Sequence, residues 1–276
     1  MRLRIAHTSV YRYDPPAAGV IQVLRLTPRN HDGQYVERWR IDVTPDARLT
    51  GHEDAFGNIS HVFTADGPLD ELTVAVDGLV ETQNADGVVR GTVERFPPSL
   101  FLRDTALTHT DAAVRDFAEA VRAGCGGNVL AVLHGLLDRL YDNASRKGAD
   151  GAAASDAEAA APANAAEAFA RKHAAPRDLS HIFIGAAHCL GIPARYVGGY
   201  CHRGGGAGAV GTPHAWAEAY VPDLGWIGFD PSSGYCPTDA HVRIAIGLDA
   251  LGAAPVRGTR LGGGAETLAV AITVDQ

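Results

Sequence analysis

Apolar and polar residues alternate along most of the first 95 residues, which is the pattern of strands with one buried face. The alternation runs through five segments, residues 3–12, 20–26, 36–43, 59–63 and 72–80. Turn-forming sequences such as Asp54-Ala-Phe-Gly-Asn58 separate them. Short strands with turns between them predict an antiparallel β-sandwich for residues 1–95. We expect His7, His52 and His61 to be surface or strand-face residues without a catalytic role.

The spacing of apolar residues becomes helical after Pro97-Pro98, where we place a domain boundary. Thr110 or Asp111 is predicted to cap a helix that ends at Gly124. Asn128 is predicted to begin a second helix, whose wide apolar stripe indicates that it packs against a core.

Two further helices are predicted in the second half of the chain. Asn164 and Glu167 have the spacing of a capping box, which predicts a short helix over residues 165–173. Residues 176–190 are apolar around most of the helix and stop before Gly191. We therefore expect this segment to be a buried central helix.

The remaining regular segments read as strands of a core sheet. They are residues 193–201, 214–221 and 226–229, followed by 238–247 and 267–274. The fold class predicted is α+β, with an N-terminal domain over residues 1–95 and a core domain over 96–276. In the core domain, the central helix packs on an antiparallel sheet.

Two segments have the composition of loops. Residues 146–163 are rich in Ala, Gly and Asp without apolar periodicity, and they are expected to form a flexible surface loop. Residues 203–211 are glycine-rich and are expected to form a mobile flap. They contain no P-loop lysine and do not match the dinucleotide-binding pattern, so we expect no cofactor.

Composition narrows the class of protein. The chain has 46% hydrophobic and 20% charged residues and a formal net charge of −8. This balance is typical of a soluble globular protein and argues against nucleic acid or an anionic membrane as a main partner. We expect a cytoplasmic protein without a signal peptide. Its four cysteines contain no C-x-x-C pair, so free thiols are expected.

Candidate chemistry is concentrated in residues 214–231. Two short strands are separated there by the turn Pro222-Asp223-Leu224-Gly225, with His214 at the start of the first strand and Asp230 after the second. In an antiparallel pair those two ends lie side by side. A carboxylate beside an imidazole can hold it in one tautomer and stabilise its protonated form.

The residues around this pair resemble the transglutaminase-like superfamily of bacteria. The matching sequences are Ile192-Pro-Ala-Arg-Tyr-Val-Gly-Gly-Tyr200, His214-Ala-Trp-Ala-Glu218 and Gly225-Trp-Ile-Gly-Phe-Asp-Pro231. Residues 4–13 and 54–58 are similar to the β-rich domain that precedes this core in bacteria. The resemblance implies a papain-like core with a Cys-His-Asp triad and acyl-transfer chemistry, namely peptide or amide hydrolysis or transamidation. His214 would be the general base and acid and Asp230 its orienting carboxylate, with Asp178 and Trp216 assigned to substrate binding.

One position departs from the family pattern. The family carries its nucleophilic cysteine at the start of the central helix, and Asp178 and His181 set the register that aligns this position with Pro176. Proline has no nucleophilic group and no backbone N–H, although it suits the first turn of a helix. The helix can therefore remain while its thiol chemistry is lost.

Four interpretations follow. The first is a protein without thiol catalysis that binds a peptide, an amide or a carboxylate, or serves as a non-catalytic subunit of a larger assembly. The second is an active cysteine enzyme that uses Cys201 or Cys236 with His214. A zinc site made of Cys201, His202, His214 and Cys236 is the third, but its spacing follows no standard pattern, so we assign no metal. The fourth is an interaction module whose sandwich and acidic surface bind a partner protein. Oligomeric state stays open.

Overall fold

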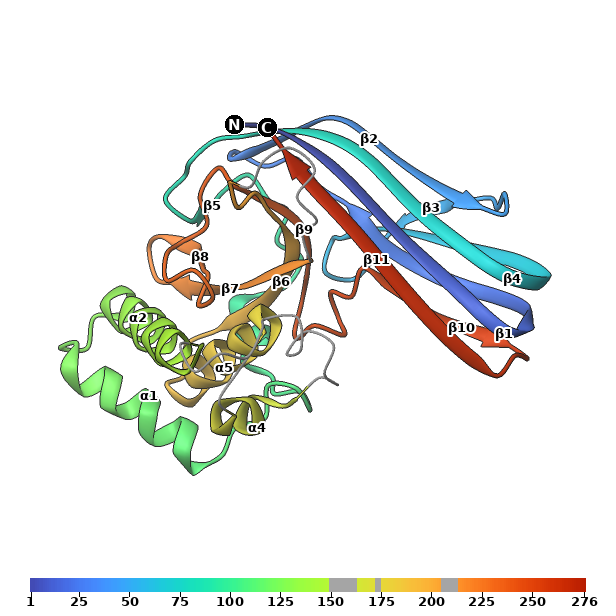
Figure 1. The fold of residues 1–276 in the computed structure, drawn as a ribbon. Helices are drawn as coiled ribbons and strands as arrows, with labels where there is room; N and C mark the ends of the chain where they lie inside the picture. Colours follow the sequence, from blue (N-terminus) through green and yellow to red (C-terminus); the bar gives the residue numbers. More distant parts are fainter. Residues whose placement is uncertain (149–162, 172–174, 205–212) are drawn as a thin grey trace.

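The computed structural model describes residues 1–148, 163–171, 175–204 and 213–276. Two long strands form the centre of its N-terminal part. Strand β1 (Arg2–Thr27) and strand β4 (Ile59–Thr82) pair antiparallel along nearly their whole length. Their register shifts between Arg12 and Gly19, where both strands bend (Figure 1). At the bend, a Cβ atom on Gly67 would lie 2.2 Å from the carbonyl oxygen of Ala17, so only glycine allows this approach.

The bend folds one continuous sheet into two layers. Strands β2 (Gln34–Thr44) and β11 (Ala265–Asp275) extend the layer formed by the first half of β1. Strands β3 (Thr50–Glu53) and β10 (Val256–Leu261) extend the layer formed by its second half. Apolar side chains from both halves share one core, which includes Tyr11, Leu24, Phe63, Leu72 and Val74. The predicted antiparallel sandwich is therefore confirmed, with its layers continuous through β1 and β4.

The last strand corrects one prediction. We expected residues 267–274 to join the core sheet, but β11 pairs with β1 over Arg4–Asp14 instead. The alternation of apolar and polar residues indicates that a segment is a strand but does not identify its neighbour. As a result, the two ends of the chain lie together, with Arg4 opposite Asp275 (Figure 1).

The core domain is built on a five-stranded antiparallel sheet. Its order is β5 (Val88–Val89), β8 (Gly225–Phe229), β7 (His214–Val221), β6 (Ala194–Cys201) and β9 (His241–Gly247). Helix α5 (Pro176–Cys189) is the buried central helix and packs on one face of this sheet, where Ala215, Ala217 and Ala219 of β7 allow close contact. A 3-10 helix, η1 (Pro98–Leu102), precedes the helices.

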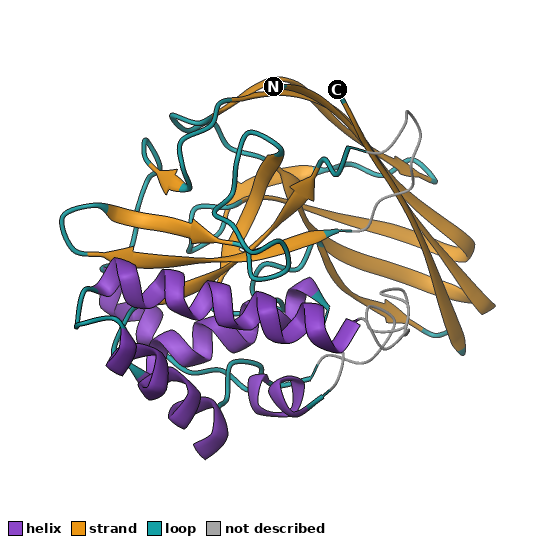
Figure 2. Cartoon of the chain, turned by 60° about the vertical axis from the view of Figure 1, so that its left-hand side comes forward, coloured by secondary structure: helices purple, strands orange, loops and turns teal. Residues whose placement is uncertain are grey.

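The other helices gather around α5 on the same side of the sheet (Figure 2). Helix α1 (Ala112–Gly124) is capped by Asp111, which accepts a hydrogen bond from the Val114 N–H, as predicted. Helix α4 (Ala165–Ala170) has the predicted capping box. Helix α2 (Val129–Gly148) includes the first residues of the segment 146–163 that we expected to be a loop. The rest of that segment, and most of the expected flap at residues 203–211, lie outside the described residues. None of the described helices is long and apolar enough to cross a membrane.

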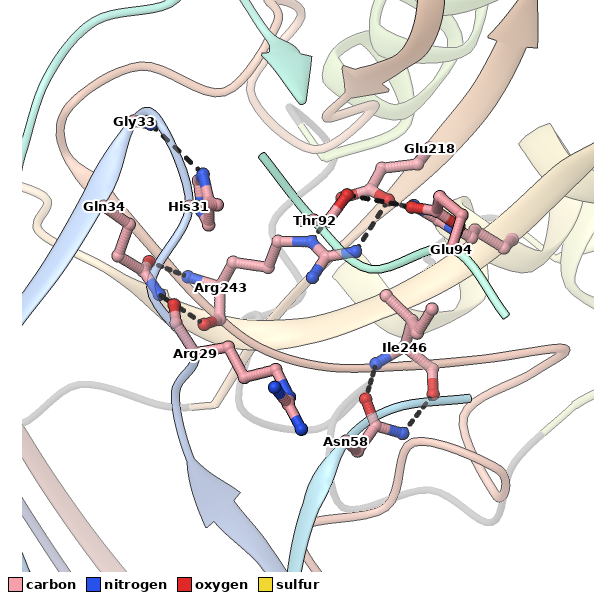
Figure 3. Close-up of polar contacts among 11 residues, drawn as sticks. Arg29, His31, Gly33, Gln34, Asn58, Thr92, Glu94, Glu218, Arg243 and Ile246 are labelled. Carbon is pink, nitrogen blue, oxygen red and sulfur yellow. Dashed lines mark hydrogen bonds and ion pairs between the residues drawn. The ribbon is translucent and has the colours of Figure 1, made fainter. Parts of the chain in front are cut away.

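Two amide side chains attach the sandwich to the free edge of the core sheet (Figure 3). Gln34 accepts a hydrogen bond from the Arg243 N–H at 2.8 Å and donates to the Arg243 carbonyl at 2.9 Å. Asn58 makes the same pair of bonds with Ile246, both at 2.8 Å. Each amide thus takes the place of a neighbouring strand along β9. The edge is covered, and the sandwich is held against the core.

A buried ionic network lies on the sheet face opposite α5. Arg195, whose side chain is fully buried, donates to Glu218 at 2.7 Å and to both oxygens of Glu94 at 2.6 and 2.9 Å. Arg243 donates to the other side of Glu218 at 2.7 Å (Figure 3). The Arg195 guanidinium also stacks over the Trp226 ring at 3.9 Å. Our sequence analysis missed this network, because no local pattern joins Glu94 to strands that lie 100 residues further along.

Candidate functional site

His214 and Asp230 meet where β7 begins and β8 ends. His214 Nε2 lies 2.7 Å from Asp230 Oδ2, and both side chains are buried. The second carboxylate oxygen of Asp230 accepts hydrogen bonds from the backbone N–H and the hydroxyl of Ser232, at 2.9 and 2.7 Å. His241 Nε2 approaches the first oxygen at 3.4 Å. Burial alone would raise the pKa of Asp230, but these donors outweigh it and hold the pKa well below its ordinary value.

The hydrogen bonds define the tautomer of His214. Arg203 Nη2 lies 3.2 Å from His214 Nδ1, and a guanidinium can only donate. Nδ1 therefore carries the lone pair, and Nε2 carries the proton that it donates to Asp230. This is the arrangement in which a carboxylate orients an imidazole whose other nitrogen is free to act as a base. Here, however, an arginine already occupies that second nitrogen.

The first turn of α5 contains Pro176 at the position where the resemblance placed a cysteine. The helix begins at Pro176 with Ala175 as its N-cap, and no side chain caps it. The next two residues, Arg177 and Asp178, have no acceptor within the helix for their backbone N–H groups. Asp178 is buried, and its side chain accepts a hydrogen bond from Arg177 Nε at 3.2 Å.

The start of α5 and His214 border one cavity of about 770 Å³. Ala175 and Arg177 contribute the helix side of its wall, and Pro213, His214 and Ala215 contribute the β7 side. Strands of the sandwich close it through His7, Arg25, Leu268 and Val270. A site of this size lies within the range of small-molecule and peptide pockets. No cysteine is found among its described lining residues.

The comparisons with known proteins follow the two parts of the fold. Residues 3–81 match the bacterial transglutaminase-like N-terminal region, and residues 115–231 match the core of the transglutaminase-like superfamily. The chain thus contains a transglutaminase-like core preceded by a bacterial transglutaminase-like N-terminal region. A proposed cysteine protease from Cytophaga hutchinsonii has the same fold, with a TM-score of 0.74 at 19% identity over 100% of this chain and 90% of that chain. An uncharacterised protein of Mycobacterium leprae is 26% identical over 286 residues, which cover 99% of this chain and 98% of that protein.

The two alternative nucleophiles of this transglutaminase-like protein lie in different places. Cys201, at the end of β6, has its sulfur within 4.8 Å of a ring nitrogen of His214 and of His241. Cys236 instead lines a separate cavity with Leu130 and His134. Burial raises the pKa of the Cys236 thiol to about 11, which disfavours the reactive thiolate. Of the two candidate nucleophiles, Cys201 is the one whose sulfur lies close to the His214 ring.

Cys201, His214 and His241 do not offer three free metal ligands. The backbone N–H of Thr238 donates to His241 Nδ1 at 3.1 Å, so a neutral His241 carries its proton on Nε2, the nitrogen that faces Asp230. A metal at Nε2 would require the loss of that proton or of the Thr238 contact. His202 and Cys236, the other two members of the metal set considered from sequence, do not belong to this group of described residues, and His202 Nδ1 donates to the Val274 carbonyl at 2.7 Å.

Trp216 lies beside the imidazoles, as a packing residue. Its ring is 6.1 Å from that of His214 and 5.5 Å from that of His241. A Cβ atom on Gly199 would lie 2.7 Å from the Trp216 ring, so the glycine leaves room for the indole. Trp216 does not line the cavity at the start of α5. Its position supports the shape of the site, and its assignment to substrate binding stays a prediction.

Sequence analysis did not predict the contacts of four residues in this region. His241, Ser232 and Arg203 contact the His214–Asp230 pair directly. His7 is buried, hydrogen-bonded to the Tyr200 hydroxyl at 2.8 Å, and lines the cavity from the sandwich. The contact of Ser232 with Asp230 could have been predicted from sequence, because an aspartate side chain commonly accepts a hydrogen bond from the residue two positions later. The other three reach the site only through the tertiary fold.

Proposed function

We propose that this transglutaminase-like protein binds a peptide, an amide or a carboxylate in the cavity beside His214 and performs no thiol chemistry at the start of α5. The observation that carries the proposal is the cavity of about 770 Å³ shared by Ala175, Arg177 and His214. Pro176, between the two lining residues Ala175 and Arg177, stands where the superfamily resemblance places a cysteine. The contact between Arg203 and His214 Nδ1 further supports binding, because it occupies the nitrogen that would accept a proton from a nucleophile.

Ligand binding can be tested with two matched peptides, N-acetyl-leucyl-leucine and N-acetyl-leucyl-leucinamide, measured by saturation-transfer NMR and isothermal titration. We expect at least one to bind, and the variant Ala254→Trp to weaken binding about 10-fold or more, because Ala254 is a half-buried residue of the cavity wall. Ala120→Trp, on the exposed side of α1, is the matched control and should leave binding unchanged. Failure of both peptides to bind, or full binding by Ala254→Trp, would contradict the proposal.

A second candidate function is favoured by the position of Cys201. Cys201 would give its thiol proton to His214 Nδ1 once Arg203 has moved off that nitrogen, and the thiolate would attack an amide carbonyl carbon. The C–N bond would break, and the amine would leave with the proton from His214. Water would then hydrolyse the thioester. The sulfur lies within 4.8 Å of a ring nitrogen of His214 and of a ring nitrogen of His241.

The Cys201 candidate is tested by alkylation and by activity. If it holds, iodoacetamide should label Cys201 at pH 7 faster than Cys236, and Cys201→Ser should abolish any amidase or transamidase activity that Cys236→Ser retains. Activity that survives in Cys201→Ser rejects it. Slow labelling of both cysteines, with no turnover of an amide, is the result expected from the binding function alone.

A further inference from the structure

Strand β11 (Ala265–Asp275) forms an edge of the sandwich. It pairs with β1, and it pairs with no other strand in the described part of the chain. Residues 265–271 of this strand are all exposed. Its sequence contains no lysine or proline, two residues that natural edge strands use to prevent pairing. Such an edge presents unpaired backbone N–H and C=O groups to which another strand can add.

The backbone groups on the outer side of this edge belong to the even-numbered residues of β11. In an antiparallel pair, alternate residues exchange both backbone hydrogen bonds with the partner strand, and the residues between them face away from it. Met1 and Thr82 exchange both bonds, so odd-numbered residues of the following part of β1 bond to β4 and even-numbered ones bond to β11. The register places those even-numbered residues opposite odd-numbered residues of β11. The bond from His202 Nδ1 to the Val274 carbonyl, which comes from outside the strand pair, agrees with this assignment.

Leu268 and Val270 combine outward-facing backbone groups with side chains in the cavity wall. Their side chains are 52% and 41% exposed and line the cavity beside His214. Among the described residues, none is bonded to the outward backbone groups of these two residues. Residues that lie directly opposite each other on neighbouring strands place their side chains on the same face of the sheet. A strand added to β11 would therefore direct alternate side chains into the cavity.

The accessible part of the edge has the length of a short peptide. Ile272 is completely buried and the Val274 carbonyl is already bonded, so the accessible outward groups are those of Glu266, Leu268 and Val270. Three alternate residues are matched by about five residues of an added strand. A stretch this short suits a peptide better than a second copy of the chain, because stable dimers bury more than about 1,000 Å². The stretch is also continuous with the cavity, since Leu268 and Val270 belong to both.

We propose that an extended peptide adds to β11 as a further strand, with its backbone bonded to Leu268 and Val270 and its alternate side chains in the cavity beside His214. Most of the described lining residues of that cavity are apolar, so apolar side chains are favoured at the alternate positions. In this mode of recognition, main-chain hydrogen bonds provide affinity and the pocket provides specificity. The inference rests on the proposed binding function and narrows its ligand to an extended peptide of about five residues.

The test uses N-acetyl-threonyl-leucyl-threonyl-leucyl-threoninamide and two N-methylated forms of it, titrated against the full-length protein. One form carries methyl groups on both leucine nitrogens, and the other carries them on the second and third threonine nitrogens. The two forms lose N–H donors on opposite edges of the extended peptide. Because one edge alone faces β11, one form should bind about 10-fold or more weakly than the parent peptide, and the other should stay within about 3-fold of it. Loss confined to the leucine form supports antiparallel addition, and loss confined to the threonine form supports parallel addition.

A variant of β11 tests the same contact from the side of the protein. Val270→Pro removes an outward-facing N–H, which an edge strand tolerates because that group is not bonded to its neighbour. This variant should weaken binding of the parent peptide about 5-fold or more. Val270→Ala is the matched control, since it shortens the side chain but keeps the N–H, and it should stay within about 3-fold of the wild type. Urea unfolding checks that Val270→Pro is folded, and the methylated peptides decide the question if it is not.

The outcomes separate this inference from the function on which it rests. Equal affinity of the two methylated forms, or failure of the pentapeptide to bind where N-acetyl-leucyl-leucine or its amide binds, overturns the inference and leaves the binding function standing. Binding by neither the pentapeptide nor the two dipeptides overturns both. A dimer in analytical ultracentrifugation that Val270→Pro abolishes would identify a second copy of the chain as the occupant of the edge, and would also overturn the inference.

Discussion

Replacement of Glu218 by alanine is expected to destabilise the protein by about 3–5 kcal/mol, the cost of removing one member of a buried ion pair. Glu218 is completely buried and accepts hydrogen bonds from both Arg195 and Arg243. Burial alone would raise its pKa, but the two guanidiniums outweigh this and lower the pKa of Glu218 to about 2. Without the Glu218 carboxylate, Glu94 is the one carboxylate left to Arg195 among the contacts described above, and Arg243 loses its buried acceptor.

Urea unfolding followed by far-UV circular dichroism measures this effect. The matched control is Asp42→Ala, which removes the carboxylate of an ion pair with Arg40 whose two side chains are 53% and 73% exposed. Exposed pairs contribute about 0–1 kcal/mol, so the control should be nearly neutral. Glu218→Gln keeps the size of the side chain and one of its two acceptor oxygens, and it should fall between the two. A Glu218→Ala variant within about 1 kcal/mol of Asp42→Ala would show that the network does not stabilise the fold.

Acidification from pH 7 to pH 5 is expected to reduce the free energy of unfolding by about 5 kcal/mol. Buried His7 and His181 and half-buried His31 each remove about 2 kcal/mol, and His241, whose pKa is raised to about 9, offsets about 1 kcal/mol. Burial lowers the pKa of His7, His31 and His181 from 6.5 to about 4 in each case. Between these two values the unfolded chain binds a proton at each histidine and the folded chain does not. Stability is therefore complete above pH 6.5 and is lost as the pH falls towards 4, at about 2 kcal/mol per histidine by pH 5.

The slope of stability against pH separates this effect from the absolute stability of a variant. His181→Phe removes one of the three groups, and its slope between pH 6.5 and pH 5 should be about one third smaller than that of the wild type. Asn84→Gln, at an exposed position without a titratable side chain, should leave the slope unchanged. A wild-type stability that is flat between pH 7 and pH 5 would mean that these histidines titrate normally in the folded protein.

The same buried groups connect stability to the site. His7 lines the cavity from the sandwich and is bonded to Tyr200 of β6, whereas His181 lies on α5 and accepts a hydrogen bond from the Ala250 N–H at 3.1 Å. Protonation of either would weaken contacts beside the cavity. Loss of ligand binding and loss of stability should therefore occur over a similar pH range.

Local sequence determined the pair at the centre of the site and the absence of a thiol at the start of α5. The turn at residues 222–225 joins β7 to β8, and this short hairpin brings His214 to Asp230 whatever the rest of the chain does. Pro176 was assigned to the start of the central helix from the positions of Asp178 and His181, and α5 begins there. The helix caps Asp111 and Asn164 could also be predicted from local sequence, because each cap and its hydrogen-bond partner lie three residues apart.

Tertiary structure decided every contact that depends on which strands become neighbours. The order β7-β6-β9 is not the order of the chain, and it brings His241 and Cys201 to His214 across 27 and 13 residues of sequence. The choice of β1 as the partner of β11 likewise places Leu268 and Val270 at the cavity. An alternating pattern indicates which face of a strand is buried but carries no information about its neighbour. Neighbours are selected by the packing of the whole core, so the cavity and its lining emerged only from the fold.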